Sequence, residues 1–352
     1  MKNRKQSIWK FFVAVLILSQ IILATEGLKT EKVGFVGAQF LKIEVGARGF
    51  ALGGAMEPIS DDASAVFWNP AGLTQGPDKS FFSTKTSWLA GIDHTAAAFS
   101  MKVPYVRGYL AVSLVGLTTD DMLVTTSGDQ DGSLGNRTFS VGNYALGLGY
   151  ALSITNKFSF GIHAKYIDEE FTRGLQDVTD GYGAGSTWAV DVGTLYLTGY
   201  KTMKIGMSIR NFGPDVQLGG TYIDYDDGEP ILDDDDQPVE NQFKPYGLPL
   251  TFKFGISADP IVNETQKLTI SVVGEHPSDN SERLNVGAEY TFQKYFVGRA
   301  GYVFNHDTKG ASAGIGINAF PIANIGKVNI DLAITDFSLF DPVWMASLGI
   351  QF

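Results

Sequence analysis

The sequence contains no cysteine, few charged residues and no second long apolar run after the one near its beginning. Without cysteine the chain can form no disulfide framework, no thiolate metal site and no cysteine nucleophile. Charged residues make up 18% of the chain, below the ~25% of ordinary soluble domains. A mean hydropathy of +0.02 argues against a bundle of membrane-spanning helices. Aromatic residues, in contrast, reach 12%. This combination is typical of transmembrane strands, whose apolar and polar faces average to neutrality.

The apolar run near the beginning has the form of a secretory signal peptide. Lys2, Arg4, Lys5 and Lys10 precede residues 11–24, which are apolar almost throughout. This run is shorter than the ~20 residues that a membrane-spanning helix needs. Cleavage after Ala24 or Gly27 is consistent with the small residues there. We therefore predict that residues 1–27 are a signal peptide, cleaved on export.

Export leaves a strongly acidic chain. The sequence has 27 Lys and Arg against 38 Asp and Glu, and four of the basic residues lie in the predicted signal peptide. If cleavage follows Ala24, 23 minus 38 gives a net charge of −15. Nucleic-acid binding needs basic patches, so no nucleic acid is expected as a partner.

Alternating apolar and polar residues predict fourteen antiparallel strands. In the last of them Trp344, Leu348, Ile350 and Phe352 share one face. The opposite faces carry mostly Gly, Ser, Thr and Asn, which suits a crowded lumen better than the exposed face of a soluble sandwich. The predicted strands are 80–88, 92–102, 106–117, 138–152, 157–170, 186–199, 203–212, 250–258, 267–276, 282–292, 295–304, 309–319, 326–336 and 343–352.

The connections support the same architecture. The three longest, 118–137, 171–185 and 213–249, all follow odd-numbered strands. Bacterial barrels have an even strand number, short periplasmic turns and longer outer loops. We therefore expect an all-β, fourteen-stranded transmembrane barrel over residues 80–352, in the bacterial outer membrane, with both termini in the periplasm. The barrel-assembly machinery is an expected partner, recognising the C-terminal strand through Trp344, Leu348, Ile350 and Phe352.

Residues 28–79 lack sustained alternation and are rich in Gly and Ala. Their apolar residues, among them Phe35, Phe40 and Leu41, argue for burial. We predict that the segment is a plug that enters the barrel. A mobile periplasmic tail is the alternative.

The plug segment carries a recognisable series of short motifs. They are Phe40-Leu41-Lys42-Ile43, Gly46-Ala47-Arg48, Gly53-Gly54-Ala55, Asp61-Asp62-Ala63-Ser64-Ala65 and Trp68-Asn69-Pro70-Ala71-Gly72-Leu73. This series resembles the N-terminal region of the PorV/PorQ family, within the wider FadL-like (OmpP1/FadL/TodX) outer-membrane group. The resemblance covers about forty residues, and beyond them only the barrel architecture is shared.

The resemblance implies a fourteen-stranded barrel with an inserted N-terminal segment, and two different functions. PorV-like proteins act in type IX secretion, where they bind exported cargo proteins and deliver them for surface attachment. FadL-like proteins instead carry long-chain fatty acids and other hydrophobic small molecules across the outer membrane. A structural or adhesive barrel is a third hypothesis. The first is preferred, with secreted cargo or secretion-system subunits as expected partners.

The same motifs supply the candidate site residues of the plug. Asn69-Pro70 is a turn signal, for which docking of the plug is a simpler role than ligand contact. Arg48, Asp61 and Asp62 are candidates for a polar cluster that holds the plug, with solvent-exposed charges as the alternative. The full predicted plug motif is Arg48, Gly53, Gly54, Asp61, Asp62, Trp68, Asn69, Pro70 and Ala71.

Strand parity points a second set of polar residues into the lumen, and their mixed signs favour mutual pairing over a selective ion pore. They are His163, Lys165, Arg210, Arg283, Glu289 and Arg299. A third set lies in the connection 213–249, predicted to be a solvated outer loop, with weak Ca²⁺ binding as the alternative. It comprises Asp224, Asp226, Asp227, Asp233, Asp234, Asp235 and Asp236.

No catalytic motif stands out. G-x-S-x-G, H-E-x-x-H and P-loop patterns are all lacking. The four histidines, His94, His163, His276 and His306, have no second histidine at metal-ligand spacing. The sequence therefore predicts no enzyme, no cofactor and no metal site.

Overall fold

The computed structural model describes residues 34–125, 130–132, 135, 137–173, 175, 183–226 and 229–352. The predicted signal peptide lies outside these residues. Among the described residues, no helix has both the length and the hydropathy of a membrane span.

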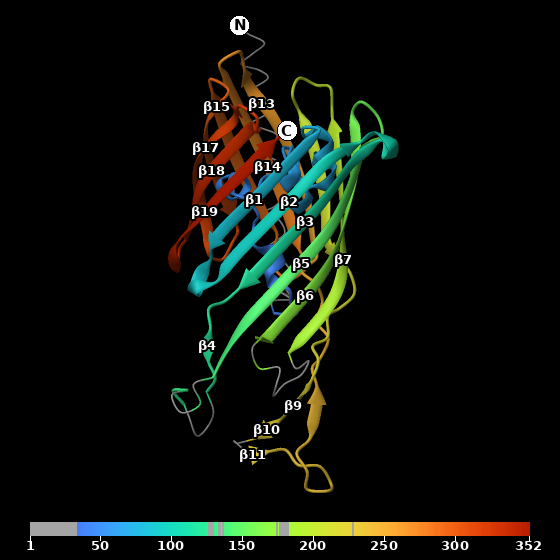
Figure 1. Cartoon of the computed structure of the whole chain (residues 1–352), viewed down its shortest axis with the longest axis vertical. Coiled ribbons are helices and arrows are strands. Elements are labelled where there is room, and N and C mark those ends of the chain that lie inside the picture. Colours follow the sequence, from blue (N-terminus) through green and yellow to red (C-terminus); the bar gives the residue numbers. More distant parts are fainter. Residues whose placement is uncertain are drawn as a thin grey trace.

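Fourteen antiparallel strands form a closed barrel (Figure 1). Each strand pairs with its neighbour in the chain, and β1 pairs with β19 to close the sheet, for example Phe81 opposite Ile350. Closure matters because hydrocarbon offers no hydrogen-bond partner to an open sheet edge. The strands are β1 (Lys79–Ser87), β2 (Asp93–Val103), β3 (Gly108–Thr118), β5 (Thr138–Ser153), β6 (Phe158–Arg173), β7 (Ala184–Leu197), β8 (Lys204–Phe212), β13 (Thr251–Val262), β14 (Gln266–Pro277), β15 (Arg283–Phe292), β16 (Phe296–Phe304), β17 (Lys309–Ile322), β18 (Gly326–Phe337) and β19 (Phe340–Gln351).

The sequence prediction of fourteen strands is confirmed, with every boundary within four residues of the structure. The largest difference is at β13, which continues past the predicted end through a bulge between Ala258 and Ile261. This extension leaves only residues 263–265 between β13 and β14.

The two ends of the barrel differ in their connections (Figure 1). The end that holds Phe352 has only short turns, and we call it the turn end. The opposite end, the loop end, carries the three long connections after β3, β6 and β8. These hold short additional strands: β4 (Met122–Leu123), β9 (Thr221–Ile223), β10 (Tyr225–Asp226), β11 (Glu229–Pro230) and β12 (Glu240–Gln242). β9 pairs with β12 and β10 with β11, so the connection 213–250 projects from the barrel as hairpins.

Successive side chains of each strand face alternately the lipid and the lumen, as the sequence predicts. On β15, Asn285 and Glu289 are buried inside, whereas Tyr290 is exposed on the outer face. On β19, Trp344 and Leu348 are exposed outside, and Met345 and Ser347 are buried inside.

The lumen is filled by the chain before β1. This plug, residues 34–78, contains η1 (Gln39–Lys42), α2 (Ala47–Ala51), η2 (Ala63–Phe67) and η3 (Pro70–Gln75). Shorter 3₁₀ turns, η4 (Leu89–Gly91) and η5 (Pro104–Val106), lie between barrel strands. Phe40, Leu52, Met56 and Trp68 of the plug pack with small inward residues of the wall to form the main hydrophobic core. The core of this membrane barrel is therefore inside its lumen.

Candidate functional site

The plug crosses the lumen from the loop end to the turn end. At the loop end Val36 pairs with Gly247, where the Gly37 N–H donates to the Gly247 carbonyl at 3.0 Å. Lys42 then reaches Asp279, in the connection between β14 and β15, at 2.8 Å. At the turn end η3 packs against β5, β6 and β7 and leads into β1. The plug is thus fixed at both ends of the barrel.

The Asn-Pro-Ala motif docks the turn-end part of the plug. The Asn69 amide donates to the carbonyls of Glu57 at 2.8 Å and Thr194 at 2.9 Å. Its oxygen accepts from the Ala71 N–H at 3.1 Å and so caps η3. Pro70 occupies the first position of that helix, where a missing N–H costs nothing. Asn69 is fully buried, so its geometry supports a docking role.

Glycines on the wall permit this close approach. A Cβ on Gly193 of β7 would lie 2.1 Å from the Asn69 side-chain oxygen, and one on Gly161 of β6 would lie 2.4 Å from the backbone of Pro70. Within the plug itself, Gly53 and Gly54 take φ values of +61° and +78° after α2. These backbone conformations favour glycine and turn the chain toward η2.

A row of alternating charges anchors α2 to the wall. Arg48 donates to Asp61 at 2.5 Å and, through two nitrogens, to Glu289 at 2.9 and 3.0 Å. Arg299 donates to Glu289 at 2.7 Å and to Asp331 at 2.5 Å. Burial opposes the charge on Arg48, but the carboxylates of Asp61 and Glu289 outweigh it and raise its pKa. The bidentate Arg48–Glu289 contact is the strong form of such a pair.

The predicted polar cluster is therefore formed in part. Arg48 and Asp61 come together, and Glu289 and Arg299 of the lumen set join them. Asp62 has a different contact, because its side chain accepts from the backbone N–H and hydroxyl of Ser64 and caps η2.

A second charged group lies between the plug and the wall, and the sequence analysis did not identify it. Glu57 is fully buried, and neither of its carboxylate oxygens has a hydrogen-bond partner among the described residues. Lys253 of β13 lies 3.8 Å from Glu57 and 3.1 Å from Glu275, and its ammonium sits 5.7 Å from the centre of the Trp68 ring. Burial raises the pKa of Glu57 to about 7, against the opposing influence of Lys253. Strand parity places Lys253 in the lumen, but the sequence gives no sign of its partner on the plug.

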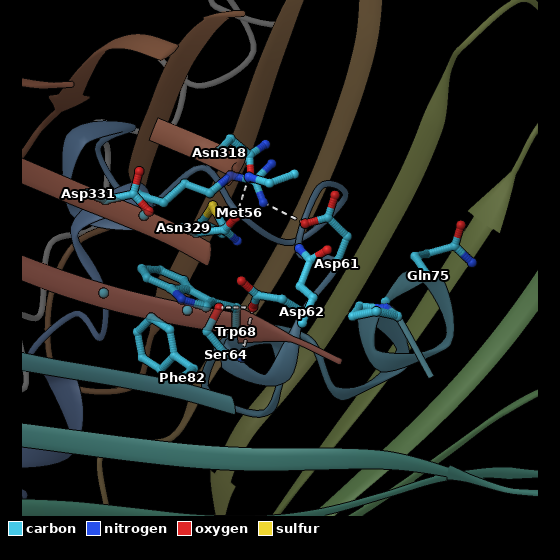
Figure 2. A pocket seen from close by; sticks show the side chains of 18 of the residues that line it. Met56, Asp61, Asp62, Ser64, Trp68, Gln75, Phe82, Asn318, Asn329 and Asp331 are labelled. Atoms are coloured by element: carbon cyan, nitrogen blue, oxygen red, sulfur yellow. Dashed lines mark hydrogen bonds and ion pairs between the residues drawn. The ribbon is translucent and has the colours of Figure 1, made fainter. Parts of the chain in front are cut away.

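A cavity of about 370 Å³ lies between the plug and the turn end. Figure 2 shows Asp61, Asp62 and Ser64 of the plug on one side of this cavity. Asn318 of β17 and Asn329 and Asp331 of β18 line the other side. Trp68 also lines the cavity, but its indole N–H is already bonded to the Val45 carbonyl at 3.0 Å. Most of the charged groups here have ion-pair partners, so the cavity is polar without strong excess charge.

His163 and Lys165 belong to a buried polar ladder across β3, β6 and β7. The His163 ring contacts Ser113 at 2.8 Å and Asp191 at 3.1 Å, and Lys165 reaches the other Asp191 oxygen at 2.8 Å. The order Ser–His–Asp is that of hydrolase triads. The adjoining void is only about 20 Å³ and is covered by Leu41 and Phe67, which leaves room for a single water. The ladder therefore cross-links the wall and offers no space for a substrate.

The remaining predicted residues lie in other parts of the molecule. Arg210 and Arg283 face a cavity at the loop end, and Arg283 lies 3.9 Å from Glu275. Asp224 and Asp233–Asp236 are exposed on the hairpins, while Asp227 lies outside the described residues. Among the described residues, no group of three or more His, Asp or Glu side chains is placed to hold a metal ion. Trp344, Leu348 and Phe352 are exposed on the outer face of the last strand and its end.

The barrel sequence matches a known protein family. The model of type IX secretion system membrane protein PorP/SprF matches residues 124–342, more than half of the chain. The chain belongs to the PorP/SprF family. This match begins after the plug, so it is independent of the plug motifs on which the likeness to PorV/PorQ rests. PorP/SprF membership and the closed barrel identify a bacterial outer-membrane protein.

Solved structures share the fold of this PorP/SprF member. The toluene transporter TodX of Pseudomonas putida is 12% identical, with a TM-score of 0.50 over 91% of this chain and 98% of that one. A TodX mutant described as a monoaromatic hydrocarbon channel is 13% identical, with a TM-score of 0.52 over 87% and 97%. A FadL homologue of Pseudomonas aeruginosa is 13% identical, with a TM-score of 0.50 over 87% and 98%. No sequence of a curated protein matches the chain. At this identity the likeness is one of fold alone.

Proposed function

We propose that this protein is a component of type IX secretion that binds exported cargo proteins at the loop end of its barrel. The observation that carries the proposal is the match of residues 124–342 to the PorP/SprF family of that system. The finer likeness to PorV/PorQ proteins, through the motifs of residues 40–73, favours the cargo-binding role. In this proposal the loop end faces the outside, and the turn end with Phe352 faces the periplasm.

The closed lumen supports a docking role over a transport role. The plug is anchored to the wall by Arg48, Asn69 and Lys42. The barrel wall is also continuous at β3. This strand pairs with β2 from Thr118 to Gly108, and with β5 from Thr118 to Tyr109. Passage through the lumen would require the plug to move, whereas a partner at the loop end needs no such movement.

The hairpins of connection 213–250 are the surface best placed for a cargo protein. They project beyond the barrel (Figure 1) and carry the exposed carboxylates of Asp224 and Asp233–Asp236. Exposed charges of one sign steer association with a partner of opposite charge. A basic surface on the cargo is the complement that this loop would favour.

Deletion of the gene and complementation with a shortened loop test the proposal. Replacing residues 221–242 with a short Gly-Ser linker removes the hairpins and leaves β8 and β13 intact. We expect the deletion strain to lose surface display of secreted proteins, and the shortened variant to restore little of it. Electrophoretic mobility of unheated and boiled samples checks that the variant barrel still folds. A matched control replaces residues 120–137, which belong to the long connection after β3 and contain the short strand β4.

Two results would count against this function. Normal surface display in the deletion strain removes the secretion role altogether. Full display with the shortened loop, in a strain that fails without the protein, places the cargo surface elsewhere on the barrel.

Transport of hydrophobic small molecules is the second candidate function. The observation in its favour is a cavity on each side of the plug, of about 370 Å³ at the turn end and about 510 Å³ at the loop end. A plug that shifted would join them into one path. Lost growth on hydrophobic substrates with undisturbed surface display in the deletion strain would select this function instead.

A further inference from the structure

The loop-end cavity has the size and the mixed lining of a small-molecule site. Its volume is about 510 Å³, within the ~300–1,000 Å³ of typical ligand pockets. It lies above α2, which separates it from the turn-end cavity: Phe50 lines the loop-end side, and Arg48 and Gly49 line the other.

One wall of the cavity is aromatic. Phe50 of α2, Trp88 after β1 and Phe337 of β18 pack with ring centres 5.3 to 6.5 Å apart. Leu89 and Ile92, at the turn between β1 and β2, extend this wall. Such a surface favours a flat ring, since offset and edge-on ring contacts add to the gain from apolar burial.

A second part of the lining is basic and has unused hydrogen-bond donors. It contains Arg210 of β8 and Arg283 of β15, and in each the buried Nε group has no partner among the described residues. The Arg283 Nη1 lies 3.9 Å from Glu275. The Arg283 side chain is only 10% exposed. Arg210 makes no ion pair with any described carboxylate. A buried donor without a partner is costly, so these two groups favour an anionic ligand that accepts from both.

The cations of the lining differ in their partners. Four of the five lie near carboxylates: Lys309 near Glu44, Lys253 and Arg283 near Glu275, and Lys42 near Asp279. Arg210 is the fifth, and no described carboxylate forms an ion pair with it. His306 adds no charge, because burial and the nearby Arg283 lower its pKa to about 4, and its Nδ1 accepts from two backbone N–H groups.

We propose that the loop-end cavity binds a small aromatic carboxylate, with its ring against Trp88 and its carboxylate at Arg210 and Arg283. The buried rings of Phe50 and Phe337 pack on Trp88 and hold it in place. A guanidinium presents donors in a plane that matches a carboxylate. A neutral hydrocarbon would leave both Nε groups unpaired, and a protonated amine has no acceptor to offer them. This site goes beyond the secretion role, because it requires no cargo protein.

Calorimetric titration of the mature protein in lipid nanodiscs tests the site, with 4-phenylbutyrate as the probe. Its neutral amide, 4-phenylbutyramide, and the ring-free acid hexanoate are the comparison ligands, and empty nanodiscs are the blank. We expect saturable binding of the aromatic acid, at least about tenfold tighter than that of the amide, since a charge-assisted hydrogen bond is lost with the charge. Hexanoate should also bind more weakly, because it lacks the ring.

Arg210→Gln is the sharpest variant, because no described carboxylate forms an ion pair with Arg210. We expect binding of 4-phenylbutyrate to weaken on the order of tenfold, and binding of the amide to change little. Arg107→Gln, at the exposed turn between β2 and β3, is the matched control. Trp88→Leu tests the aromatic wall, with the lipid-facing Trp188→Leu as its control.

Equal affinities for the acid and the amide would overturn the proposal, as would equal losses in Arg210→Gln and Arg107→Gln. Heats that match the empty nanodiscs would also overturn it, because they report partition into lipid. A heat-modifiable band in each variant ensures that the barrel is intact. Surface display of secreted proteins by the Arg210→Gln strain separates this site from the proposed secretion role, which does not depend on Arg210.

Discussion

Two acidic regions of this protein use their carboxylates in opposite ways. Inside the barrel, Glu57 and Glu289 are buried: Glu57 of the plug lies 3.8 Å from Lys253 of the wall, and Glu289 of the wall lies 2.9 Å from Arg48 of the plug. On the hairpins of connection 213–250, Asp233–Asp236 are exposed and contact mainly one another's backbone. Carboxylates therefore face cations across the boundary of plug and wall in one region, and they charge a surface in the other.

The difference separates the rigid part of the molecule from the part available to a partner. Buried pairs are expensive to disrupt, because removal of one partner leaves an uncompensated charge in a poorly solvated site. Exposed charges contribute little to stability, yet they govern encounter with other molecules. Four substitutions test this contrast, in order of decreasing expected effect.

Lys253→Met should have the largest effect. It leaves Glu57 and Glu275 buried without their shared cation, and we expect the free energy of unfolding to fall by about 3–5 kcal/mol. Urea titration of the refolded barrel in detergent measures the change. Adding Glu57→Gln to this variant should restore part of the loss. A loss below about 0.5 kcal/mol would mean that water reaches the pair and that the contrast with the hairpins is false.

Glu57→Gln should change the pH dependence of stability. The pKa of Glu57 is raised from its ordinary value of 4.5 to about 7, so between these values the folded protein binds more protons than the unfolded chain. Stability therefore falls as pH rises through this range, by roughly 3 kcal/mol in total. The variant should match the wild type near pH 4 and exceed it at pH 8. Unfolding titrations at both pH values provide the measurement, and parallel pH profiles would contradict the expectation.

Asn69→Ala tests a buried amide of the plug, and Asn241→Ala tests an exposed amide of the hairpins. It removes donors to the Glu57 and Thr194 carbonyls and the cap of η3, and we expect a loss of about 2 kcal/mol. The matched control is Asn241→Ala in the hairpins, whose amide contacts Asp224 at an exposed site. That control should change stability by less than about 0.5 kcal/mol. Similar losses in both variants would show that the plug is not docked through Asn69.

Replacing all four of Asp233–Asp236 with Asn should have the smallest effect. We expect the unfolding free energy to change by less than about 0.5 kcal/mol, while association with a basic cargo protein slows at low salt. Calcium titration of the wild-type protein, followed by loop fluorescence or protease protection, should show no ordering of the hairpins. If calcium protects the hairpins of the wild type from protease but not those of the Asn variant, the hairpins contain a cation site.

The barrel is readable from sequence because lipid forces a two-residue period on every strand. Trp344 and Leu348 must face acyl chains, and Met345 and Ser347 must then face inward, so strand positions follow from polarity alone. The plug has no such period. Its burial could be inferred from Phe40 and Leu41, but its path through the lumen could not.

The sequence also does not predict which inward-facing charges contact one another. Parity places Arg299 and Glu289 in the lumen, and neighbouring strands bring them together. The contact of Glu57 with Lys253 depends on where an irregular segment meets the wall, and the contact of Ser113 with His163 passes over an intervening strand at Gly147. Such contacts depend on the three-dimensional path of the backbone, which local patterns do not encode.

The bridge between Val36 and Gly247 bears on how the molecule is assembled. The plug lies threaded along the whole barrel and continues directly into β1, one side of the seam with β19. A finished cylinder would have to admit this segment lengthwise, although the small wall residues leave only the space that the plug fills. Pairing of β1 with β19 around a plug that is already in place avoids that difficulty. Insertion into the membrane and filling of the interior then become a single event.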